Sequence, residues 1–590
     1  MIRLPYHFSS MSAQRFTWKI GGEAGFGIVT SGVLFAKMCA AMGRFTADYN
    51  EKPNLIRGGH NIHQVTVADE PVFAVSFSVN LLLALNRETV FLHLTELAPG
   101  ARVIYDDDKA HIAAGELART DVLLCPVPLM KLTQEAKGDE IMRNTVGIGA
   151  SLAFMGCAFE PLEDALKKTF GRKPDVCTQN IAAARLGFDY VRAHYAHDLL
   201  PCMLGANTVH DKIVIAGNEA MALGAIQGGC TFYAAYPMSP SSSILHFLAA
   251  HDHDTGMVVK HAEDEIAVIN MALGASFAGA RAMIGTSGGG FALMVESLGL
   301  AGIAELPLVI IEVQRPGPAT GMPTWTEAAD LRFALHAAQG EFPRVVLAPG
   351  DVEECFTHTF LAHNLAERWQ LPVIMLSDKL LGETNRSIPP FATKGMRVDR
   401  GKMMSEKELE KAKQFHRYAL TDDGVSPRSI PGQKGGIYLS NSYEHELHGY
   451  SDETGEMRIA QADKRMKKLA HLLPEMPKPL LIGEKGASLT FVTWGSTKGP
   501  AREAVVRLNE EGMKANMIHF AGIWPFPVKE ATELLNAQKH LVLVENNATA
   551  QFGGFIREQT GIHIEDKILK YNGRPFFSEE IMATTKGRLN

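Results

Sequence analysis

The chain has 590 residues, enough for three or four domains and too many for one small binding module. Apolar residues make up 46% and charged residues 21%, which excludes disorder as the main state, and the net charge of -7 offers no basic field for a nucleic-acid backbone. Because no apolar run approaches the roughly 20 residues of a membrane span and no export signal is visible, we expect a cytoplasmic protein without nucleic-acid or membrane partners.

The cysteine pattern argues against two kinds of site. The seven cysteines are scattered singly, and no CxxC pair occurs. A disulfide framework and a cysteine-ligated zinc or iron–sulfur site are therefore disfavoured within this chain, and we expect no metal site in it.

The first block, residues 1–205, opens with a strand over 16–20, a glycine-rich turn and a helix over 29–42. Later strands near 65–67 and 103–105 and a helix over 148–159 predict an open α/β sheet. The turn GGEAGFG contains Gly21, Gly22, Gly25 and Gly27, which is not the GxGxxG spacing of a dinucleotide site, even though Asp48 stands where a ribose-binding acid is expected. Phosphate or anion binding stays open there.

A short basic loop follows in the same block. The segment KPNLIRGGHN places Lys52, Arg57 and His60 around two glycines in an otherwise acidic chain. By itself this pattern is more typical of a solvated loop than of a binding site.

The second block, residues 206–392, predicts a doubly wound parallel sheet with strands near 283–286, 306–313 and 372–376. Its first candidate site segment is YPMSPSSS after an apolar run. A Ser-rich helix start after a strand aims hydroxyls and free N–H groups into the crevice where such sheets bind ligands. Helix capping by Ser239 or Ser241 is an equally good explanation.

The segment HAEDEIAVINMALGASFAGA places Glu263, Asp264 and Glu265 at the start of a helix. The helix dipole alone favours carboxylates there. The continuation over 266–280 is apolar nearly all round, which predicts a buried helix and a partly desolvated Glu265. A desolvated carboxyl group keeps a proton more readily and can share it with a ring nitrogen of a ligand.

Two further loops complete the set. In TSGGG, Ser287, Gly288 and Gly289 allow a backbone to approach a ligand closely, although a tight turn is nearly as good a reason for the glycines. In QRPGPATGMPT, Arg315 follows a strand and is held by prolines, as a clamp for a carboxylate is, or as a surface arginine in a turn. Four such loops in one domain predict a small-molecule site.

The remaining chain divides at residue 480. Charged and turn-rich residues 393–480 are interpreted as a linker that wraps the neighbouring domains. Residues 481–590 contain the strand LTFVTW, a helix over 499–511, two more strands and a helix from about 553, which predicts a compact α/β domain.

These segments together resemble the 2-oxoacid:ferredoxin oxidoreductases. GNEAMALGAIQGG, YPMSPSSS, EDEIAVINMALGASFAGARAMIGTSGGGFALM and QRPGPATGMPT are similar to the family's α subunit. GGEAGFG and IRGGHN are similar to its γ domain, here fused N-terminally, an arrangement that indicates the 2-oxoglutarate branch. The resemblance covers almost the whole chain. It implies a multidomain α/β fold, with a γ-type domain, a pyrimidine-binding-type doubly wound domain and a C-terminal domain.

By this resemblance the enzyme uses thiamine diphosphate and coenzyme A to decarboxylate a 2-oxoacid oxidatively and passes electrons to ferredoxin. Glu265 would hydrogen-bond the cofactor's aminopyrimidine, with Ser287, Gly288 and Gly289 beside it. Ser239, where the family usually has Thr, would bind the 2-oxo group and Arg315 the substrate carboxylate. Gly22, Gly25, Gly27, Lys52 and Arg57 would lie near coenzyme A. Trp325 stands where the family pattern PTKTEQGD has Lys, so the partner of the substrate's distal group stays open.

The resemblance also implies a partner. Thiamine enzymes hold diphosphate and Mg²⁺ with a GDG motif followed by NN, and no GDG occurs here, while Asn546 and Asn547 stand alone. We therefore expect a β subunit to supply that site and the [4Fe-4S] cluster, in an α2β2 assembly with the cofactor at the α/β interface. Pyruvate or a branched-chain 2-oxoacid stays open as substrate, as does reductive carboxylation as direction. A dinucleotide-dependent oxidoreductase and a non-catalytic scaffold are the alternatives of other classes.

Overall fold

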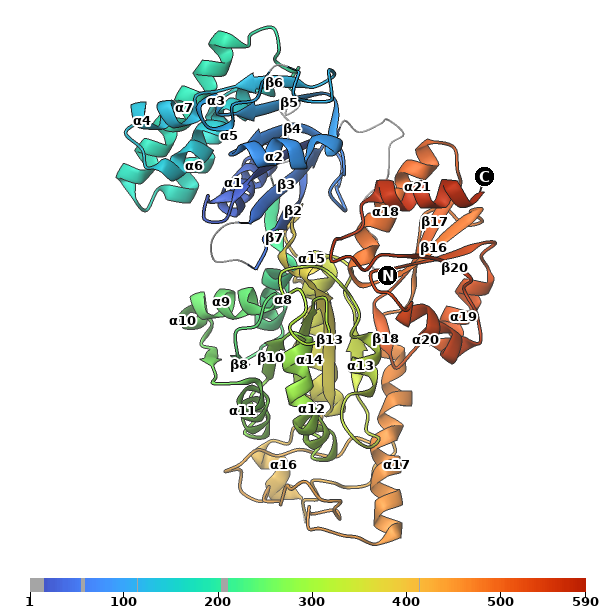
Figure 1. Cartoon of the computed structure of the whole chain (residues 1–590). Coiled ribbons are helices and arrows are strands. Elements are labelled where there is room, and N and C mark those ends of the chain that lie inside the picture. Colours follow the sequence, from blue (N-terminus) through green and yellow to red (C-terminus); the bar gives the residue numbers. More distant parts are fainter. Residues whose placement is uncertain (1–14, 55–58, 114, 203–210, 413, 590) are drawn as a thin grey trace.

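The computed structural model describes residues 15–54, 59–113, 115–202, 211–412 and 414–589, and these contain three sheets. The N-terminal domain lies on top of a central domain, the C-terminal domain stands beside the central one, and a helical linker segment lies below them (Figure 1). The expected multidomain α/β class is confirmed. No helix in the described residues is long and apolar enough to span a membrane.

The first sheet has eight strands in the order β6-β5-β4-β1-β3-β2-β14-β7. Its strands are β1 (Arg15–Glu23), β2 (Phe45–Glu51), β3 (His60–Ala68), β4 (Val79–Ala84), β5 (Leu97–Tyr105), β6 (Leu123–Pro126), β7 (Ile213–Ala216) and β14 (Asn385–Ile388). The accompanying helices are α1 (Ile28–Ala41), α2 (Arg87–Leu92), α3 (Asp107–Ala110), α4 (Leu129–Glu135), α5 (Arg143–Phe154), α6 (Glu160–Phe170) and α7 (Pro174–His194).

The second sheet has seven strands in the order β18-β12-β13-β11-β10-β8-β9. Its strands are β8 (Phe232–Ala235), β9 (Val258–His261), β10 (Ala282–Thr286), β11 (Leu308–Gln314), β12 (Val345–Leu347), β13 (Pro372–Asp378) and β18 (Gly522–Trp524). Its helices are α8 (Gly217–Gln227), α9 (Ser242–Ala250), α10 (Asp252–Thr255), α11 (Glu265–Phe277), α12 (Gly288–Ile303), α13 (Leu331–His336), α14 (Val352–Trp369) and α15 (Lys379–Glu383). All seven residues of β11 are buried, as expected for a parallel strand covered on both faces.

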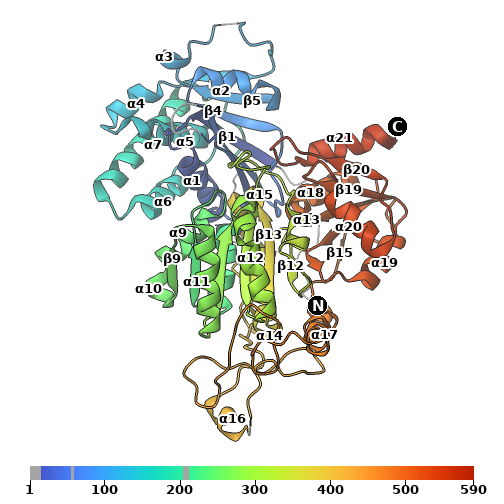
Figure 2. The same cartoon turned by 60° about the horizontal axis from the view of Figure 1, so that its bottom comes forward.

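The third sheet has five strands in the order β15-β17-β16-β19-β20. Its strands are β15 (Leu480–Ile482), β16 (Leu489–Trp494), β17 (Ala515–Phe520), β19 (Leu541–Glu545) and β20 (Asp566–Leu569). The remaining helices are α16 (Glu406–Lys411) and α17 (Gly455–Leu472) in the linker, and α18 (Lys498–Glu510), α19 (Val528–Asn536), α20 (Gln551–Thr560) and α21 (Ser578–Leu589) in the C-terminal domain. Figure 1 shows α17 leading from the linker towards that domain, and Figure 2 shows the linker with α16 projecting beyond the central domain.

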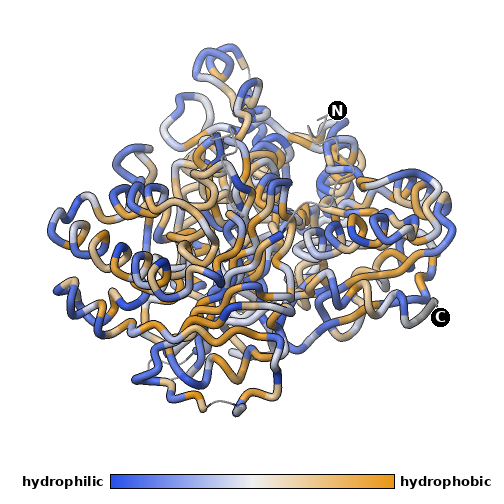
Figure 3. Tube along the Cα trace, turned by 90° about the horizontal axis from the view of Figure 1, so that it is seen from above, coloured by the Kyte–Doolittle hydropathy of each residue, from blue (hydrophilic) through white to orange (hydrophobic). Residues whose placement is uncertain are grey.

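The sheets do not follow the boundaries expected from sequence. Strands β7 and β14, which lie within residues 206–392, complete the first sheet, and β18 of the C-terminal block pairs with β12 of the second sheet. The first and second sheets are therefore each completed by strands from another block, whereas the third sheet is built within residues 480–569. Seen from above, the apolar strands run through the middle of the molecule and polar residues gather at its rim (Figure 3).

Candidate active site

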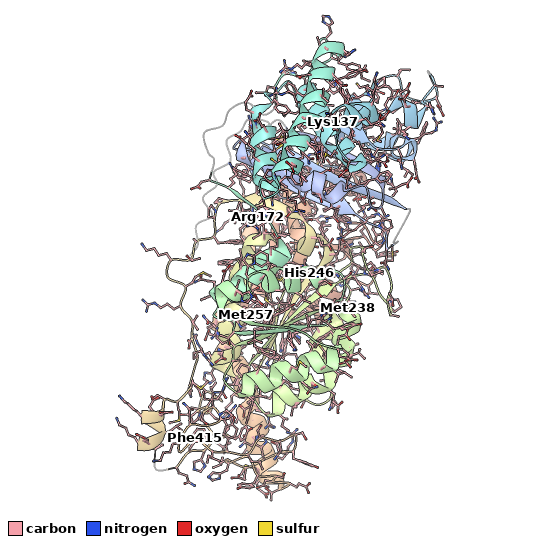
Figure 4. All side chains as sticks on the ribbon, turned by 90° about the vertical axis from the view of Figure 1, so that its left-hand side faces the viewer. Lys137, Arg172, Met238, His246, Met257 and Phe415 are labelled. Carbon is pink, nitrogen blue, oxygen red and sulfur yellow. The ribbon has the colours of Figure 1, made fainter. Side chains whose placement is uncertain are left out.

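The candidate loops follow four neighbouring strands of the second sheet. YPMSPSSS follows β8, Glu265 follows β9, TSGGG follows β10 and Arg315 follows β11. The strands β9-β8-β10-β11 are parallel neighbours, so their carboxyl ends share one edge of the sheet, hereafter the substrate edge. Met238, labelled in Figure 4, marks the loop after β8. This edge is where open α/β sheets place their ligands.

Glu265 is the first residue of α11, and the side chain of Asp264 caps the helix by accepting from the N–H of Ala267 at 2.7 Å. Glu265 is only 4% exposed, and its Oε1 has no hydrogen-bond partner. A Cβ at position 290 would lie 2.9 Å from that oxygen, so Gly290 lets α12 approach. A buried carboxyl with an unfilled position suits a ligand that carries a hydrogen-bond donor.

The prediction of a wholly buried α11 was wrong. One face of the helix is buried, but Ile266 is 51% and Met271 41% exposed, and Leu293 of the neighbouring α12 is 53% exposed. The apolar residues all round α11 thus fall into two sets, one in the core and one at the surface. Exposed large apolar side chains on neighbouring helices are compatible with a protein–protein contact.

Ser239 and Arg315 come together across the substrate edge. The guanidinium of Arg315 donates to the backbone oxygen of Ser239 at 2.6 Å, although 76 residues separate them. Ser239 is exposed and Arg315 is half-buried. Burial lowers the pKa of Arg315, and the nearby charge of Asp330 acts in the opposite direction. The hydrogen bond thus joins the loop after β8 to the loop after β11.

The TSGGG loop leads into the first turn of α12. Ser287 is fully buried at the N-cap position, and its Oγ has no hydrogen-bond partner. A Cβ at position 289 would come no closer than 4.0 Å to another described atom, the oxygen of Ala319. The helix start thus offers an unpartnered hydroxyl and open backbone beside Glu265.

Two acidic residues near this edge were missed by the sequence reasoning. Glu312 is fully buried in β11, and Asp330 ends the loop that starts at Arg315. The sequence could have indicated Glu312, because an acidic residue inside an apolar run such as LPLVIIEV is rarely buried without a partner or a function.

Asn546 and Asn547, noted in the sequence as a lone pair, hold the end of the same loop from the C-terminal domain. Asn547 donates through Nδ2 to the oxygen of Ala328 at 3.1 Å, and the oxygen of Asn546 accepts from the N–H of Ala328 at 2.8 Å. These two hydrogen bonds attach the loop that starts at Arg315 to the C-terminal domain.

In the first sheet, the glycine-rich turn is shorter than predicted. Gly21 and Gly22 lie inside β1, where a Cβ at either position would press on a neighbouring side chain. The turn itself spans Gly25 and Gly27. Both of these have positive φ, 89° and 71°, which favours glycine, and Gly27 precedes α1.

The basic loop lies at the same edge as this turn. Glu23, which ends β1, pairs with His60, and β2 ends beside them at Glu51. Lys52 forms an ion pair with Glu383 at 3.1 Å, and Arg57 lies outside the described residues. The ring of His60 contacts that of His93, Nε2 to Nε2, at 2.8 Å.

Asp48 does not serve as a ribose-binding acid. It is 1% exposed, and its carboxylate accepts from the N–H and the Nδ2 of Asn385 at 2.6 and 2.8 Å. His63 lies 3.0 Å from the same carboxylate. Together with the glycine spacing, these contacts argue against a dinucleotide site.

One contact connects the two edges. Arg574 of the C-terminal domain lies over the Trp325 ring at 3.3 Å and forms an ion pair with Glu51 at 3.1 Å. Trp325 belongs to the loop that starts at Arg315, and Glu51 precedes Lys52. The substrate edge and the glycine-turn edge of the first sheet therefore meet through one arginine. Among the described residues no group of three or more His, Cys, Asp and Glu side chains is arranged for a metal ion.

Comparison with known families covers most of the chain. Residues 17–190 match the family described as pyruvate ferredoxin/flavodoxin oxidoreductase. Residues 223–464 match its thiamine-diphosphate-binding domain, and residues 487–579 match core domain II of pyruvate:ferredoxin oxidoreductase.

Individual relatives extend over the full length. The α subunit of a 2-oxoacid:ferredoxin oxidoreductase from Saccharolobus solfataricus is 34% identical, with 97% of each chain covered. The 2-oxoglutarate oxidoreductase subunit KorA of Mycobacterium tuberculosis is 28% identical over 97% of this chain and 92% of its own. The solved 2-oxoglutarate:ferredoxin oxidoreductase of Magnetococcus marinus, with 2-oxoglutarate, coenzyme A and succinyl-CoA bound, superposes with a TM-score of 0.90 at 31% identity, covering 98% of this chain and 100% of that one.

Proposed function

Because the chain belongs to the 2-oxoacid:ferredoxin oxidoreductases, as an α subunit, we propose that its substrate is 2-oxoglutarate, converted with coenzyme A and oxidised ferredoxin into succinyl-CoA, CO₂ and reduced ferredoxin. The main support for 2-oxoglutarate as the substrate is the full-length similarity to the Magnetococcus marinus enzyme, whose bound ligands include the substrate and the product of this reaction. The same residues serve reductive carboxylation when the flux is reversed.

We assign the substrate's 1-carboxylate to Arg315 and its 2-oxo group to Ser239. Support comes from the hydrogen bond of the Arg315 guanidinium to the backbone oxygen of Ser239 at 2.6 Å, which brings the two residues together as a 2-oxoacid head group requires. The cation neutralises the carboxylate and fixes the substrate's orientation, and the hydroxyl donates to the oxo oxygen, where negative charge grows during the reaction.

Glu265 is assigned to proton handling. Its orphaned Oε1 lies in the core beside the open start of α12, so a donor on a bound heterocycle would fill that position. Thiamine diphosphate, when bound, supplies the nucleophilic carbon and the electron sink that decarboxylation needs. The contribution of Glu265 is to hold a proton at a ring nitrogen from a site shielded from water.

Coenzyme A is assigned to the edge of the first sheet where Gly22, Gly25, Gly27 and Lys52 lie. Arg57, the fifth residue expected to bind it, lies outside the described residues. Support comes from the contact of Glu51 with Arg574, which in turn lies on Trp325 of the substrate loop. That chain of contacts brings the edge of the first sheet to the substrate edge, and an acyl acceptor must reach the site of decarboxylation.

A β subunit is assigned to the exposed apolar face of α11 and α12. The support is that Ile266, Met271 and Leu293 are exposed on the same two helices that carry Glu265 and Gly290. A partner seated there would cover the cofactor site and could supply the diphosphate and Mg²⁺ ligands and the iron–sulfur cluster. An α2β2 assembly, ferredoxin as acceptor and a cytoplasmic location stay predictions.

The test is anaerobic reduction of ferredoxin or a low-potential dye by this chain, with and without its co-expressed β subunit. Thiamine diphosphate, Mg²⁺, coenzyme A and a panel of 2-oxoacids are supplied. We expect turnover only with the partner and the highest kcat/KM for 2-oxoglutarate. A preference for pyruvate or a branched-chain 2-oxoacid would overturn the substrate assignment, and turnover of the isolated chain with NAD would overturn the reaction class.

A further inference from the structure

The glycine-turn edge of the first sheet carries a chain of titratable side chains that the assignments above leave unused. Nε2 of His60 lies 2.8 Å from Nε2 of His93, and Nδ1 of His93 lies 3.0 Å from Oε1 of Glu96. The other oxygen of Glu96 accepts from Lys19, whose Nζ also lies 3.2 Å from Nδ1 of His93. These four side chains come from β3, from the segment after α2 and from β1, and they form one continuous network.

Most of this network is shielded from water. Lys19 is 2% and His93 7% exposed, whereas His60 and Glu96, at its two ends, are half-buried. Nδ1 of His60 is buried and has no hydrogen-bond partner among the described residues. A Cβ at position 21 would lie 3.2 Å from Cε1 of His60, so Gly21 lets the imidazole lie close over β1. The network therefore ends in a polar atom that a donor on a ligand would satisfy.

The face of the sheet that bears the network also bears the contact with the substrate loop. His60 and Lys19 share this face with Glu51, because residues opposite each other in neighbouring strands point to the same side. Glu51 forms the ion pair with Arg574, which lies on Trp325. The network is thus on the side of the first sheet from which an acyl acceptor has to reach the substrate edge.

We propose that His60 is a catalytic base for the thiol of coenzyme A, and that His93 and Glu96 relay the proton it takes. This inference rests on the proposed function, because it takes coenzyme A as the ligand of this edge. The proton of the S–H bond moves to Nδ1 of His60, while the proton on its Nε2 moves to Nε2 of His93. The electron pair of the S–H bond stays on sulfur as a thiolate, the nucleophilic form that forms the thioester bond.

The positive charge comes to rest beside Glu96 and not on His60. Since His60 gains one proton and gives up another, it stays neutral and only changes its tautomer. Its surroundings favour this, because burial, His93 and Lys19 lower the pKa of His60 to about 4, against the opposing effect of Glu96. His93 becomes the cation, next to a carboxylate whose side chain is 21% exposed. Glu96 stabilises that cation and connects it to solvent, where the proton is released.

The experiment separates the two halves of the reaction in the reconstituted holoenzyme by rapid quench. For His60→Gln we expect succinyl-CoA formation at neutral pH to slow about a hundredfold, while CO₂ release in a single turnover without coenzyme A changes less than about threefold. The affinity for coenzyme A, measured by calorimetry, should also change less than about threefold. His253→Gln, which changes an exposed histidine of α10, is the matched control and should leave all three quantities unchanged.

The pH profile distinguishes a base from a structural contact. In His60→Gln the thiolate has to form by itself, so succinyl-CoA formation should rise about tenfold for each pH unit below the pKa of the thiol. The unmodified enzyme should have a flatter profile around neutral pH, because the relay removes the proton. The groups that act on His60 there are Lys19, His93 and Glu96, and Glu23, opposite His60 in β1, is exposed. Added imidazole should restore part of the rate in His60→Ala.

A second variant covers the case in which a change at His60 disturbs folding. His93→Gln leaves His60 in place but removes the group that takes up the charge, so succinyl-CoA formation should slow by a similar factor. Because the two histidines act as a unit, the double variant should be no slower than either single one.

Three results would overturn the relay. They are equal slowing of CO₂ release and succinyl-CoA formation in His60→Gln, a pH profile parallel to that of the unmodified enzyme, and additive effects in the double variant. Lys52→Gln separates the two levels, because an unchanged KM for coenzyme A in that variant would remove coenzyme A from this edge. A raised KM there, with normal succinyl-CoA formation in His60→Gln, refutes only the relay.

Discussion

Two buried glutamates of the central domain, Glu265 and Glu305, have opposite surroundings. Glu305 is fully buried just after α12, and its two oxygens form ion pairs at 2.6 Å with Lys464 and Lys468 of α17. Glu265 is almost as deeply buried, yet its Oε1 has no partner. A buried charge with a full set of partners belongs to the architecture, and one with an open position is expected to meet a ligand.

The pKa of Glu305 shows how neighbouring cations offset the effect of burial on a carboxylate. Burial alone would raise its pKa, but the two lysines and Arg417 reverse the effect and hold it well below the ordinary value. The lysines are perturbed as well, since burial lowers the pKa of Lys464 to about 8. Arg417 also donates to the backbone oxygen of Glu305 at 2.8 Å. The segment expected to be a linker is thus fastened to the central domain. Phe415, labelled in Figure 4, marks it at the far end from the N-terminal domain.

The largest effect is expected from removing the carboxylate without a partner. Glu265→Gln should lower turnover of the reconstituted enzyme by about two to four orders of magnitude, because it removes the proton-handling group. Since Oε1 has no partner to lose, the free energy of unfolding should change by less than about 1 kcal/mol. Dye reduction and urea denaturation measure the two quantities. Near-normal turnover of this variant with thiamine diphosphate would favour the alternative that the chain is a non-catalytic scaffold.

The converse change tests the compensated glutamate. Glu305→Leu leaves Lys464 and Lys468 buried without their anion, so the free energy of unfolding should fall by about 3–5 kcal/mol while the folded fraction keeps its kcat. Glu475→Gln, which breaks a partly exposed pair with Arg368, is the control and should cost less than about 1 kcal/mol. A lower kcat in fully folded Glu305→Leu protein would contradict the assignment of a structural role to Glu305 and a catalytic role to Glu265.

The pH dependence of that loss follows from the direction of the shift. The pKa of Glu305 is lower in the folded chain than its ordinary value of 4.5, so its stabilising contribution is complete above 4.5 and is lost as the pH falls through the folded pKa. The difference in unfolding free energy between Glu305→Leu and the unmodified chain should therefore be constant in weakly acid to neutral solution and shrink only in stronger acid. Denaturation curves at several pH values check this.

A smaller effect is expected where the two edges meet. Trp325→Ala removes the ring on which Arg574 lies, and should lower the free energy of unfolding by about 1–2 kcal/mol. If the glycine-turn edge carries coenzyme A, the KM for coenzyme A should rise in this variant more than the KM for 2-oxoglutarate. Equal changes in both would argue that the contact serves stability alone.

The smallest effect concerns the hydroxyl at the substrate edge. Ser239→Thr restores the residue usual in the family and keeps the hydroxyl, so kcat/KM should change by less than about threefold. Ser239→Ala removes it and should lower kcat/KM about tenfold. Steady-state kinetics with 2-oxoglutarate measure both, and equal values for the two variants would remove Ser239 from the site.

Much of the site could be predicted because its signals are local. A buried strand that ends in a Ser-, Gly- or Arg-containing loop is visible in a short window, and parallel strands bring such loops to one edge. The sequence thus placed Ser239, Glu265, Ser287 and Arg315 on loops that the structure brings together. The resemblance and the comparisons then agree on the family.

What only the tertiary structure decided depends on contacts between distant residues. No local sequence pattern indicates that β7, β14 and β18 join the sheets of other blocks. The same is true of the exposed side of α11 and of the hydrogen bonds between Asp48 and Asn385. The same holds for the ion pairs of Glu305 with two lysines of α17. Burial periodicity is set by near neighbours in the chain, whereas the partners of a buried charge are set by whichever segments the fold packs around it.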